Sequence, residues 1–179
     1  MTYVVGLKIN DYGTSAIICD TKCNAFDDNL RKEVPAVKNG MLFEGCIFGA
    51  AGNVDHICRF IDDYLNYLSS LSSNEQLWDK FTTFVSGYDF FEYDSFEMLL
   101  SSNWSGKPLF YHLNPKHSFV LQEAHENENL ITIGSGKEFF DTKLIDYLAD
   151  CSKVNMKGTF KPEHFVYNCC AFLMTLSQG

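Results

Sequence analysis

The sequence predicts an α+β fold in which helices cover the outer faces of two β-sheets. Segments of strand composition open the chain, two helical patterns follow, and further strand segments precede a second pair of helices. The strand segments are short, and Gly, Pro, Asn or Ser residues bound them. Because a sheet and a helix each bury an apolar face, this order packs most simply with one pair of helices on each of two sheets.

One domain accounts for the whole sequence. The 179 residues are enough for a proper hydrophobic core, and 46% hydrophobic with 21% charged residues is a normal composition for a globular protein. No internal repeat and no linker interrupts the pattern. We therefore treat residues 1–179 as a single domain.

The first elements are a hairpin and a buried strand. Residues 2–9 and 15–20 predict two strands joined by a polar turn at residues 10–13. Residues 21–38 are polar, so we expect a loop there with at most a short turn. Residues 41–48 predict one buried strand.

Two helices are expected next. The small residues 49–52 close the strand, and Asn53 suits a helix N-cap because its side chain accepts from the N–H groups of a first turn. Apolar residues then recur at helical spacing, namely Val54, Ile57, Cys58, Ile61, Leu65 and Leu68. The second helix is marked by Leu77, Phe81, Phe84 and Val85.

The second half of the chain repeats the order of strands and helices. Short strands are expected over residues 96–100, 108–113, 118–122 and 130–133. The Gly-Ser-Gly turn at residues 134–136 ends the last strand and opens a helix, and Pro162 suits the first position of the final helix.

Charge and composition argue against several functions. A net charge of −9 opposes binding to nucleic acids or to anionic membranes, and no apolar run is long enough to cross a bilayer. The N-terminus lacks the basic and apolar regions of a secretory signal. The seven cysteines include no C-x-x-C pair, so we expect reduced thiols and a cytoplasmic location.

Thr2 is the candidate nucleophile. Once Met1 is removed, Thr2 carries a free α-amine beside its hydroxyl, which places a nucleophile and its general base in one residue. An amine pKa of about 7.7–8.0 leaves a neutral fraction near pH 7 that accepts the hydroxyl proton. The competing interpretation is an ordinary β-branched residue at the start of a strand.

Three segments of the chain resemble proteasome β-type subunits, and in particular the compact HslV-like bacterial peptidase that works with an ATPase ring. They are residues 1–20, residues 48–55 before a long helix, and the Ile-Gly-Ser-Gly run in residues 130–136 before another helix. Their order and rough spacing hold over nearly the whole chain. The resemblance implies the four-layer αββα sandwich of the N-terminal-nucleophile (Ntn) hydrolases.

The resemblance also implies a set of site residues. Thr2 matches the family's nucleophile, Asp20 the acid that holds a catalytic lysine, and Ser135 the serine near the terminal amine. Backbone N–H groups at Ala51 or Gly52 would face the oxyanion. A lysine kept charged by Asp20 would lower the pKa of the Thr2 amine and stabilise the developing anion.

The position of the catalytic lysine stays open at this point. An ungapped match to the family puts Glu33 at that position, with Lys32 next to it, and adjacent residues of a strand lie on opposite faces. A shift of one residue in the preceding loop restores Lys32, which we take as the candidate. Glu33 in that place would instead raise the amine pKa and oppose oxyanion formation.

Two functions follow from the resemblance. One is a threonine-type peptidase that hydrolyses peptide bonds through an acyl-enzyme on Thr2, and the other is a catalytically inactive proteasome-like structural or assembly subunit. Both imply a homo-oligomeric ring, and the peptidase also implies a peptide substrate and an ATPase unfoldase as partner. Neither needs a metal ion or an organic cofactor. We expect no counterpart of the family's last C-terminal strands, because the final helix runs to the end of the sequence.

Two further patterns carry less specific signals. The Gly-Ser-Gly-Lys run at residues 134–137 is typical of an anion-binding turn, but it lacks the full phosphate-loop spacing and a Glu follows it. His112, His117 and His125 lie near predicted turns without metal-ligand spacing, so we expect them in solvated loops.

Overall fold

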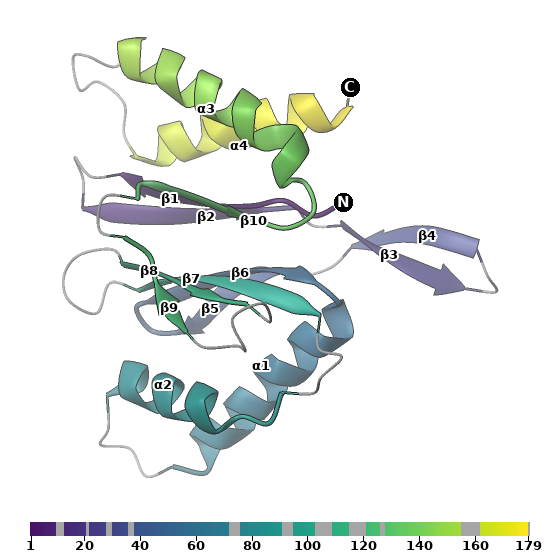
Figure 1. Cartoon of the computed structure of the whole chain (residues 1–179), viewed down its shortest axis with the longest axis vertical. Coiled ribbons are helices and arrows are strands. Elements are labelled where there is room, and N and C mark those ends of the chain that lie inside the picture. The colour runs from purple at the N-terminus through teal and green to yellow at the C-terminus, as the bar shows by residue number, and fades with distance from the viewer. Residues whose placement is uncertain are drawn as a thin grey trace.

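In the computed structural model, two antiparallel sheets lie face to face between two pairs of helices (Figure 1). The α+β fold predicted from the sequence is confirmed as far as its combination of antiparallel sheets with helices is concerned. The structure describes the chain except residues 10–12, 21, 28–29, 36–37, 72–75, 91–94, 103–108, 115–120, 126–127, 155–161 and 179. At residues 22–27, 30–35 and 152–154 it describes the backbone only.

The first sheet contains the N-terminal hairpin. Strands β1 (Val4–Ile9) and β2 (Thr14–Cys19) pair antiparallel, which confirms the predicted hairpin. Strand β10 (Leu130–Ile133) pairs with the other edge of β1, giving the order β10-β1-β2. This pairing brings the turn after β10 beside the start of β1, so residues distant in sequence meet at Thr2.

The second sheet has the order β5-β6-β7-β8-β9. Its strands are β5 (Asn39–Phe43), β6 (Cys46–Gly52), β7 (Phe96–Ser102), β8 (Leu109–Leu113) and β9 (Gln122–Glu123).

Two predictions about strands were wrong, and the strand predicted at residues 118–122 lies mostly outside the described residues. Residues 41–48 do not form one strand, because Gly45 adopts φ 84° and turns the chain between β5 and β6. Residues 21–38 are not a loop, because β3 (Lys22–Asp27) and β4 (Leu30–Pro35) form a separate two-stranded hairpin.

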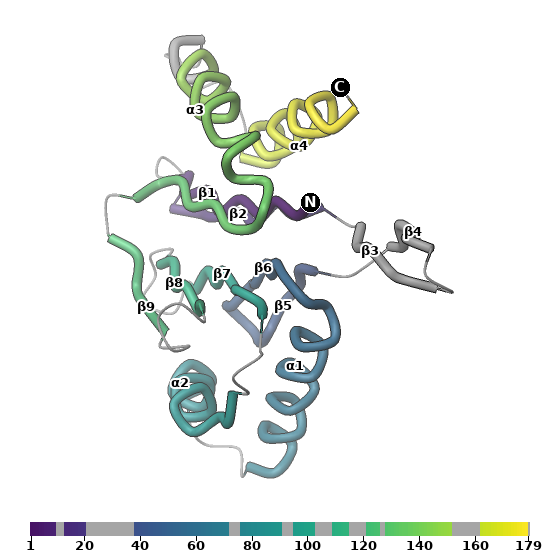
Figure 2. Tube along the Cα trace, turned by 45° about the vertical axis from the view of Figure 1, so that its right-hand side comes forward, coloured from purple at the N-terminus to yellow at the C-terminus, as the bar shows by residue number. Residues whose placement is uncertain are grey.

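The helices cover the outer faces of the sheets, as both views show (Figures 1 and 2). Helices α1 (Val54–Ser69) and α2 (Leu77–Gly87) lie against the second sheet, and α3 (Lys137–Val154) and α4 (Pro162–Gln178) lie against the first. The predicted N-cap of α1 is confirmed, since the side chain of Asn53 accepts hydrogen bonds from the N–H groups of Asp55 and His56.

Three hydrophobic clusters fill the spaces between these layers. The α1–α2 side is aromatic and includes Phe43, Phe60, Tyr64, Phe81 and Phe84. The α3–α4 side includes Tyr3, Val5, Leu7, Phe140 and Leu144. The cluster between the sheets contains Val4, Ala51, Leu99, Phe110 and Ile133. Alternate residues of β1 therefore face opposite clusters, as the period of a strand requires.

Gly49 lets the two sheets approach closely at the N-terminal end of β1. A Cβ atom at this position would lie 2.6 Å from side-chain atoms of both Val4 and Ile17. The absence of a side chain thus brings the start of β1 against β6, where Thr2 meets the second sheet. Within the part of the chain that the structure describes, no helix has the length and apolar character needed to cross a membrane.

Candidate active site

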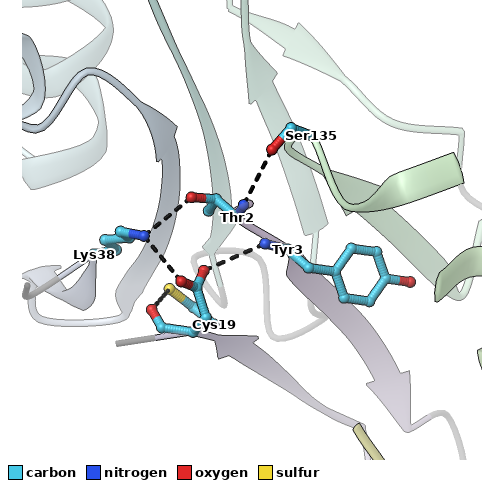
Figure 3. A network of polar contacts seen from close by, with 6 residues as sticks. Thr2, Tyr3, Cys19, Lys38 and Ser135 are labelled. Atoms are coloured by element: carbon cyan, nitrogen blue, oxygen red, sulfur yellow. Dashed lines mark hydrogen bonds and ion pairs between the residues drawn. The ribbon is translucent and has the colours of Figure 1, made fainter. Parts of the chain in front are cut away.

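Thr2 lies where polar groups from several segments converge (Figure 3). Lys38 Nζ donates to Thr2 Oγ1 over 3.0 Å and also lies 3.0 Å from Asp20 Oδ2. Thr2 N donates to Ser135 Oγ over 3.1 Å. The structure therefore brings together Thr2, Asp20 and Ser135, three of the residues expected at the site, with a lysine between the first two.

Pairing of β1 with β2 explains the position of Asp20. Val4 pairs with Cys19, so Asp20 follows directly at the end of β2, beside Tyr3. Asp20 Oδ1 accepts a hydrogen bond of 3.3 Å from Tyr3 N, while Oδ2 accepts from Lys38. One carboxylate thus fixes the backbone next to Thr2 and the ammonium that contacts the Thr2 hydroxyl.

Lys38 carries a buried charge. Only 2% of its side chain is exposed, compared with 30% for Asp20, and its carbonyl oxygen accepts a hydrogen bond of 2.7 Å from Ala50 N. A buried ammonium needs a counter-charge and hydrogen-bond acceptors, which Asp20 and the Thr2 hydroxyl provide. The same ammonium is placed to stabilise negative charge that develops on Thr2 Oγ1.

Lys38 stands where the sequence analysis expected Lys32. Lys32 lies in β4 opposite Ala25, and Glu33 lies opposite Asn24; the side chains of both are outside the described residues. The β3–β4 hairpin lies between Asp20 and Lys38 and lengthens the chain there. An ungapped match to the family therefore does not reach Lys38. The signal for this hairpin is the polar Asp-Asp-Asn run at residues 27–29, which is typical of a turn.

At the end of β6, successive backbone N–H groups point alternately toward β7 and toward Lys38. Asn53 N donates to Ser95 O on the β7 side over 2.7 Å, whereas Ala50 N donates to Lys38 O on the opposite side over 2.7 Å. Because N–H directions alternate along a strand, the Gly52 N–H points to the same side as that of Ala50. This is the side on which Lys38 lies.

Ala51 and Gly52 therefore differ as oxyanion candidates. Ala51 pairs with Glu97 of β7, and its side chain is buried in the cluster between the sheets. Gly52 adopts φ 120°, a backbone conformation that L side chains rarely take. The alternation along the strand favours Gly52 N–H over Ala51 N–H as the donor.

Cys19 lies next to the site but does not compete as a nucleophile. Its Sγ donates to Asp20 O over 3.1 Å. Burial raises the pKa of the Cys19 thiol to about 12; the negative charge of Asp20 adds to this increase, and the positive charge of Lys38 opposes it. Since the thiolate is the reactive form of cysteine, a pKa this high keeps Cys19 in the protonated, poorly nucleophilic form at neutral pH.

The expected solvated-loop position was wrong for His112. His112 belongs to β8, and its Nε2 lies 3.0 Å from Glu97 Oε2. His125 is exposed, and His117 lies outside the described residues. Among the residues that are described, no group of three or more His, Cys, Asp and Glu is arranged to hold a metal ion.

The Gly-Ser-Gly turn at residues 134–136, after β10, is hydrogen-bonded to Thr2. Gly136 N donates to Thr2 O over 2.8 Å, and Lys137 N donates to Gly134 O over 3.3 Å. These N–H groups are used within the chain, which argues against the phosphate-loop interpretation. The turn holds Thr2 by its nitrogen, through Ser135, and by its carbonyl oxygen, through Gly136.

Comparison with known proteins bears on the fold. No protein-family model and no curated protein sequence matches the chain. Among solved structures, the chain is similar to Anbu, the ancestral β-subunit, from Yersinia bercovieri, with a TM-score of 0.67 and 14% identity over 98% of this chain and 74% of that one. It is also similar to eukaryotic HslV from Trypanosoma brucei, with a TM-score of 0.54 and 11% identity over 80% and 78% of the two chains.

A third similar structure is Anbu from Hyphomicrobium sp. strain MC1, with a TM-score of 0.58 and 16% identity. That match covers 80% of this chain and 64% of the Hyphomicrobium protein. At such low identities the likeness concerns the fold and not the chemistry. The chain thus has a proteasome-like fold, similar to the folds of HslV and Anbu.

Proposed function

We propose that this protein is a proteasome-like threonine peptidase subunit with the Ntn-hydrolase sandwich, and that it hydrolyses peptide bonds through Thr2. The observation that supports this proposal best is the position of Lys38 Nζ, 3.0 Å from Thr2 Oγ1 and 3.0 Å from Asp20 Oδ2. The nitrogen of Thr2 lies at the same time 3.1 Å from Ser135 Oγ. A chain of hydrogen bonds therefore links Asp20 to Lys38, Lys38 to the Thr2 hydroxyl, and the Thr2 nitrogen to Ser135.

Removal of Met1 is the step that creates the base. While Met1 is attached, the nitrogen of Thr2 is an amide, which does not accept a proton at neutral pH. Met1 is 62% exposed, so an aminopeptidase has access to it. After its removal the same nitrogen becomes a primary amine next to the hydroxyl.

In the acylation step, the neutral Thr2 amine accepts the hydroxyl proton as Oγ1 attacks the substrate carbonyl carbon. Lys38 stabilises the charge that develops on Oγ1, and Gly52 N–H donates to the oxyanion. The C–N bond then breaks, and the proton held by the amine passes to the leaving amine. The product is an ester between Thr2 Oγ1 and the acyl part of the substrate.

In the deacylation step, water attacks this ester. The Thr2 amine accepts a proton from the water and returns it to Oγ1 as the ester bond breaks. Asp20 keeps Lys38 charged and oriented throughout, and Ser135 keeps the amine in place. No metal ion or organic cofactor takes part in either step.

We further propose a homo-oligomeric ring in the cytoplasm, with peptides delivered by an ATPase unfoldase. The similar Yersinia protein is named as a β-subunit, which is one component of an assembly. Large exposed apolar side chains on the helices offer contact area for neighbouring copies. They are Leu65 on α1, Phe139 and Ile145 on α3, and Tyr167 and Met174 on α4.

Substitution of Thr2 tests the peptidase proposal. Intact mass first establishes that Met1 is absent, and hydrolysis of a set of fluorogenic peptides is then measured for the wild type, T2A and T2S. We expect no hydrolysis by T2A and retained hydrolysis by T2S, which keeps a hydroxyl and an α-amine. T175A, an exposed threonine on α4, is the matched control and should behave as the wild type.

A retained Met1, or a T2A variant as active as the wild type, would contradict the proposal. Retained Met1 without hydrolysis would favour the structural or assembly subunit, which keeps the fold without the chemistry.

A further inference from the structure

Glu97 bridges the two sheets at the edge of the candidate site. It lies in β7 of the second sheet, in register with Ala51. Its Oε1 accepts a hydrogen bond of 2.9 Å from the N–H of Gly134, in the turn that follows β10 of the first sheet. One side chain therefore connects the end of β6, next to Gly52, with the turn that holds Thr2.

The second carboxylate oxygen is held as well. Oε2 accepts from Asn114 Nδ2 over 3.2 Å and lies 3.0 Å from His112 Nε2. Burial acts to raise the pKa of Glu97, but hydrogen bonds from His112 and Gly134, together with electrostatic interactions with His112 and Lys137, outweigh it and lower that pKa. Glu97 is thus a fixed anionic acceptor at neutral pH.

The turn that Glu97 holds is in direct contact with the backbone of Thr2. Gly134 has φ 99°, and a Cβ atom there would overlap the carbonyl oxygen of Thr2. Ser135 Oγ accepts from Thr2 N, and Gly136 N donates to Thr2 O. Any displacement of this turn therefore moves Ser135 Oγ and Gly136 N, the two groups that hydrogen-bond to the main chain of Thr2.

We propose that Glu97 is a positioning residue for the Thr2 nucleophile, acting by fixing the 134–136 turn. This inference rests on the proposed peptidase function. The hydrogen bonds of Glu97 go to Gly134, His112 and Asn114 and not to Thr2. The turn that Glu97 fixes holds the Thr2 nitrogen against Ser135. The amine must remain aligned with its own hydroxyl for proton transfer, and a misplacement of about 1 Å costs about 100-fold in rate.

Three substitutions of Glu97 separate the effect of side-chain length, which sets the hydrogen bond to Gly134, from the effect of its negative charge. E97Q keeps the length and an oxygen that accepts from Gly134 N–H, although it loses the negative charge. E97D keeps the charge but is one methylene shorter, so its carboxylate retracts from Gly134. E97A removes both. Positioning by the hydrogen bond to Gly134 predicts that E97Q retains most of the activity, whereas E97D and E97A lose it.

The experiment measures kcat and KM for peptide hydrolysis, together with hydrogen exchange of the peptide that covers residues 134–136. For E97A and E97D we expect kcat to fall by about 10- to 100-fold with little change in KM, and the 134–136 amides to exchange faster. E123A, an exposed glutamate in β9, is the matched control. Equal kcat in E97A and wild type, or an E97Q variant as slow as E97D, would overturn the proposal.

Hydrogen exchange keeps the inference separate from the peptidase proposal. If the wild type neither loses Met1 nor hydrolyses peptides, the peptidase proposal fails, but the exchange measurement still reports on the turn. Faster exchange in E97D than in E97Q would then support the hold of Glu97 on residues 134–136. Equal exchange in the wild type, E97Q and E97D would overturn it. If E97A does not fold, the comparison of E97Q with E97D gives the same answer.

Discussion

Lys38 shows at the residue scale how burial defines the candidate site. Its ammonium is almost completely removed from solvent and contacts the Thr2 hydroxyl and the Asp20 carboxylate. In such an environment a charge interacts more strongly with its neighbours than it does in water. The burial that removes Lys38 from solvent also raises the pKa of the neighbouring Cys19 thiol.

Alkylation of the cysteines tests this contrast in the folded protein. Burial raises the pKa of Cys19, Cys46 and Cys169 to about 12 in each case, whereas Cys58 is exposed on α1. At about pH 8 iodoacetamide should therefore modify Cys58 well before these three. Peptide mapping by mass spectrometry after timed quenching measures the order, and urea-unfolded protein is the control. Modification of Cys19 as fast as Cys58 would contradict the described environment.

At the scale of elements, the contact between β1 and β6 determines where Thr2 meets Lys38. Gly49 allows this contact because a side chain there would meet Val4 and Ile17. The turn after β10 completes the arrangement, since Glu97 holds it from β7. The site thus depends on how the two sheets are packed and not on any single element.

Substitution of Gly49 by Ala should separate the sheets. The new Cβ atom would lie 2.6 Å from Val4 and Ile17, so we expect a loss of about 1–3 kcal/mol in the free energy of unfolding. Urea denaturation measures it. Gly87 is the matched control, because a Cβ built there meets no atom within 4 Å apart from its chain neighbours and the backbone of its own helix. Equal stability of G49A and G87A would show that the sheets are not closely packed at Gly49.

The pH dependence of stability reports on Glu97. Because the pKa of Glu97 is lower in the folded protein than its ordinary value of 4.5, its stabilising contribution is present above that pH. The contribution disappears as the pH falls through the lowered pKa. E97Q does not titrate, so the difference in Tm between wild type and E97Q should shrink as the pH falls below about 4.5. A difference that stays constant on acidification below this pH would contradict the lowered pKa.

At the scale of the whole molecule, the order of most elements could be predicted from the sequence. Helical spacing after Asn53 and Pro162, and the N-terminal hairpin, are local patterns and appear where they were expected. The β3–β4 hairpin and the turn at Gly45 were missed, because a polar hairpin and a single glycine leave weak local signals. Because this hairpin was not expected, the family's lysine was assigned to Lys32, whereas in the structure Lys38 contacts Thr2.

Residues joined only by packing between sheets were not predictable. Glu97 has no sequence signal, since its partners Gly134, His112 and Asn114 come from other segments and meet it only in the folded chain. Thr2 was predicted from its position directly after Met1, whereas Asp20 and Ser135 were predicted only through the resemblance to a family. The fold supports that resemblance, but a fold does not establish a function, so the reactivity of Thr2 has to be measured.

The measurement that tests the account most directly is acylation of the protein by a peptide β-lactone, which reacts with hydroxyl nucleophiles. Intact mass and N-terminal sequencing would follow the wild type, K38M and K32M, with circular dichroism establishing that each is folded. We predict one adduct on Thr2 of a wild-type chain that lacks Met1, and a labelling rate about 10²- to 10³-fold lower in K38M, because the electrostatic stabilisation of Thr2 Oγ1 is lost. A chain that retains Met1 and takes no adduct, or loss of labelling in K32M while K38M reacts normally, would contradict the assignment of Thr2 and Lys38.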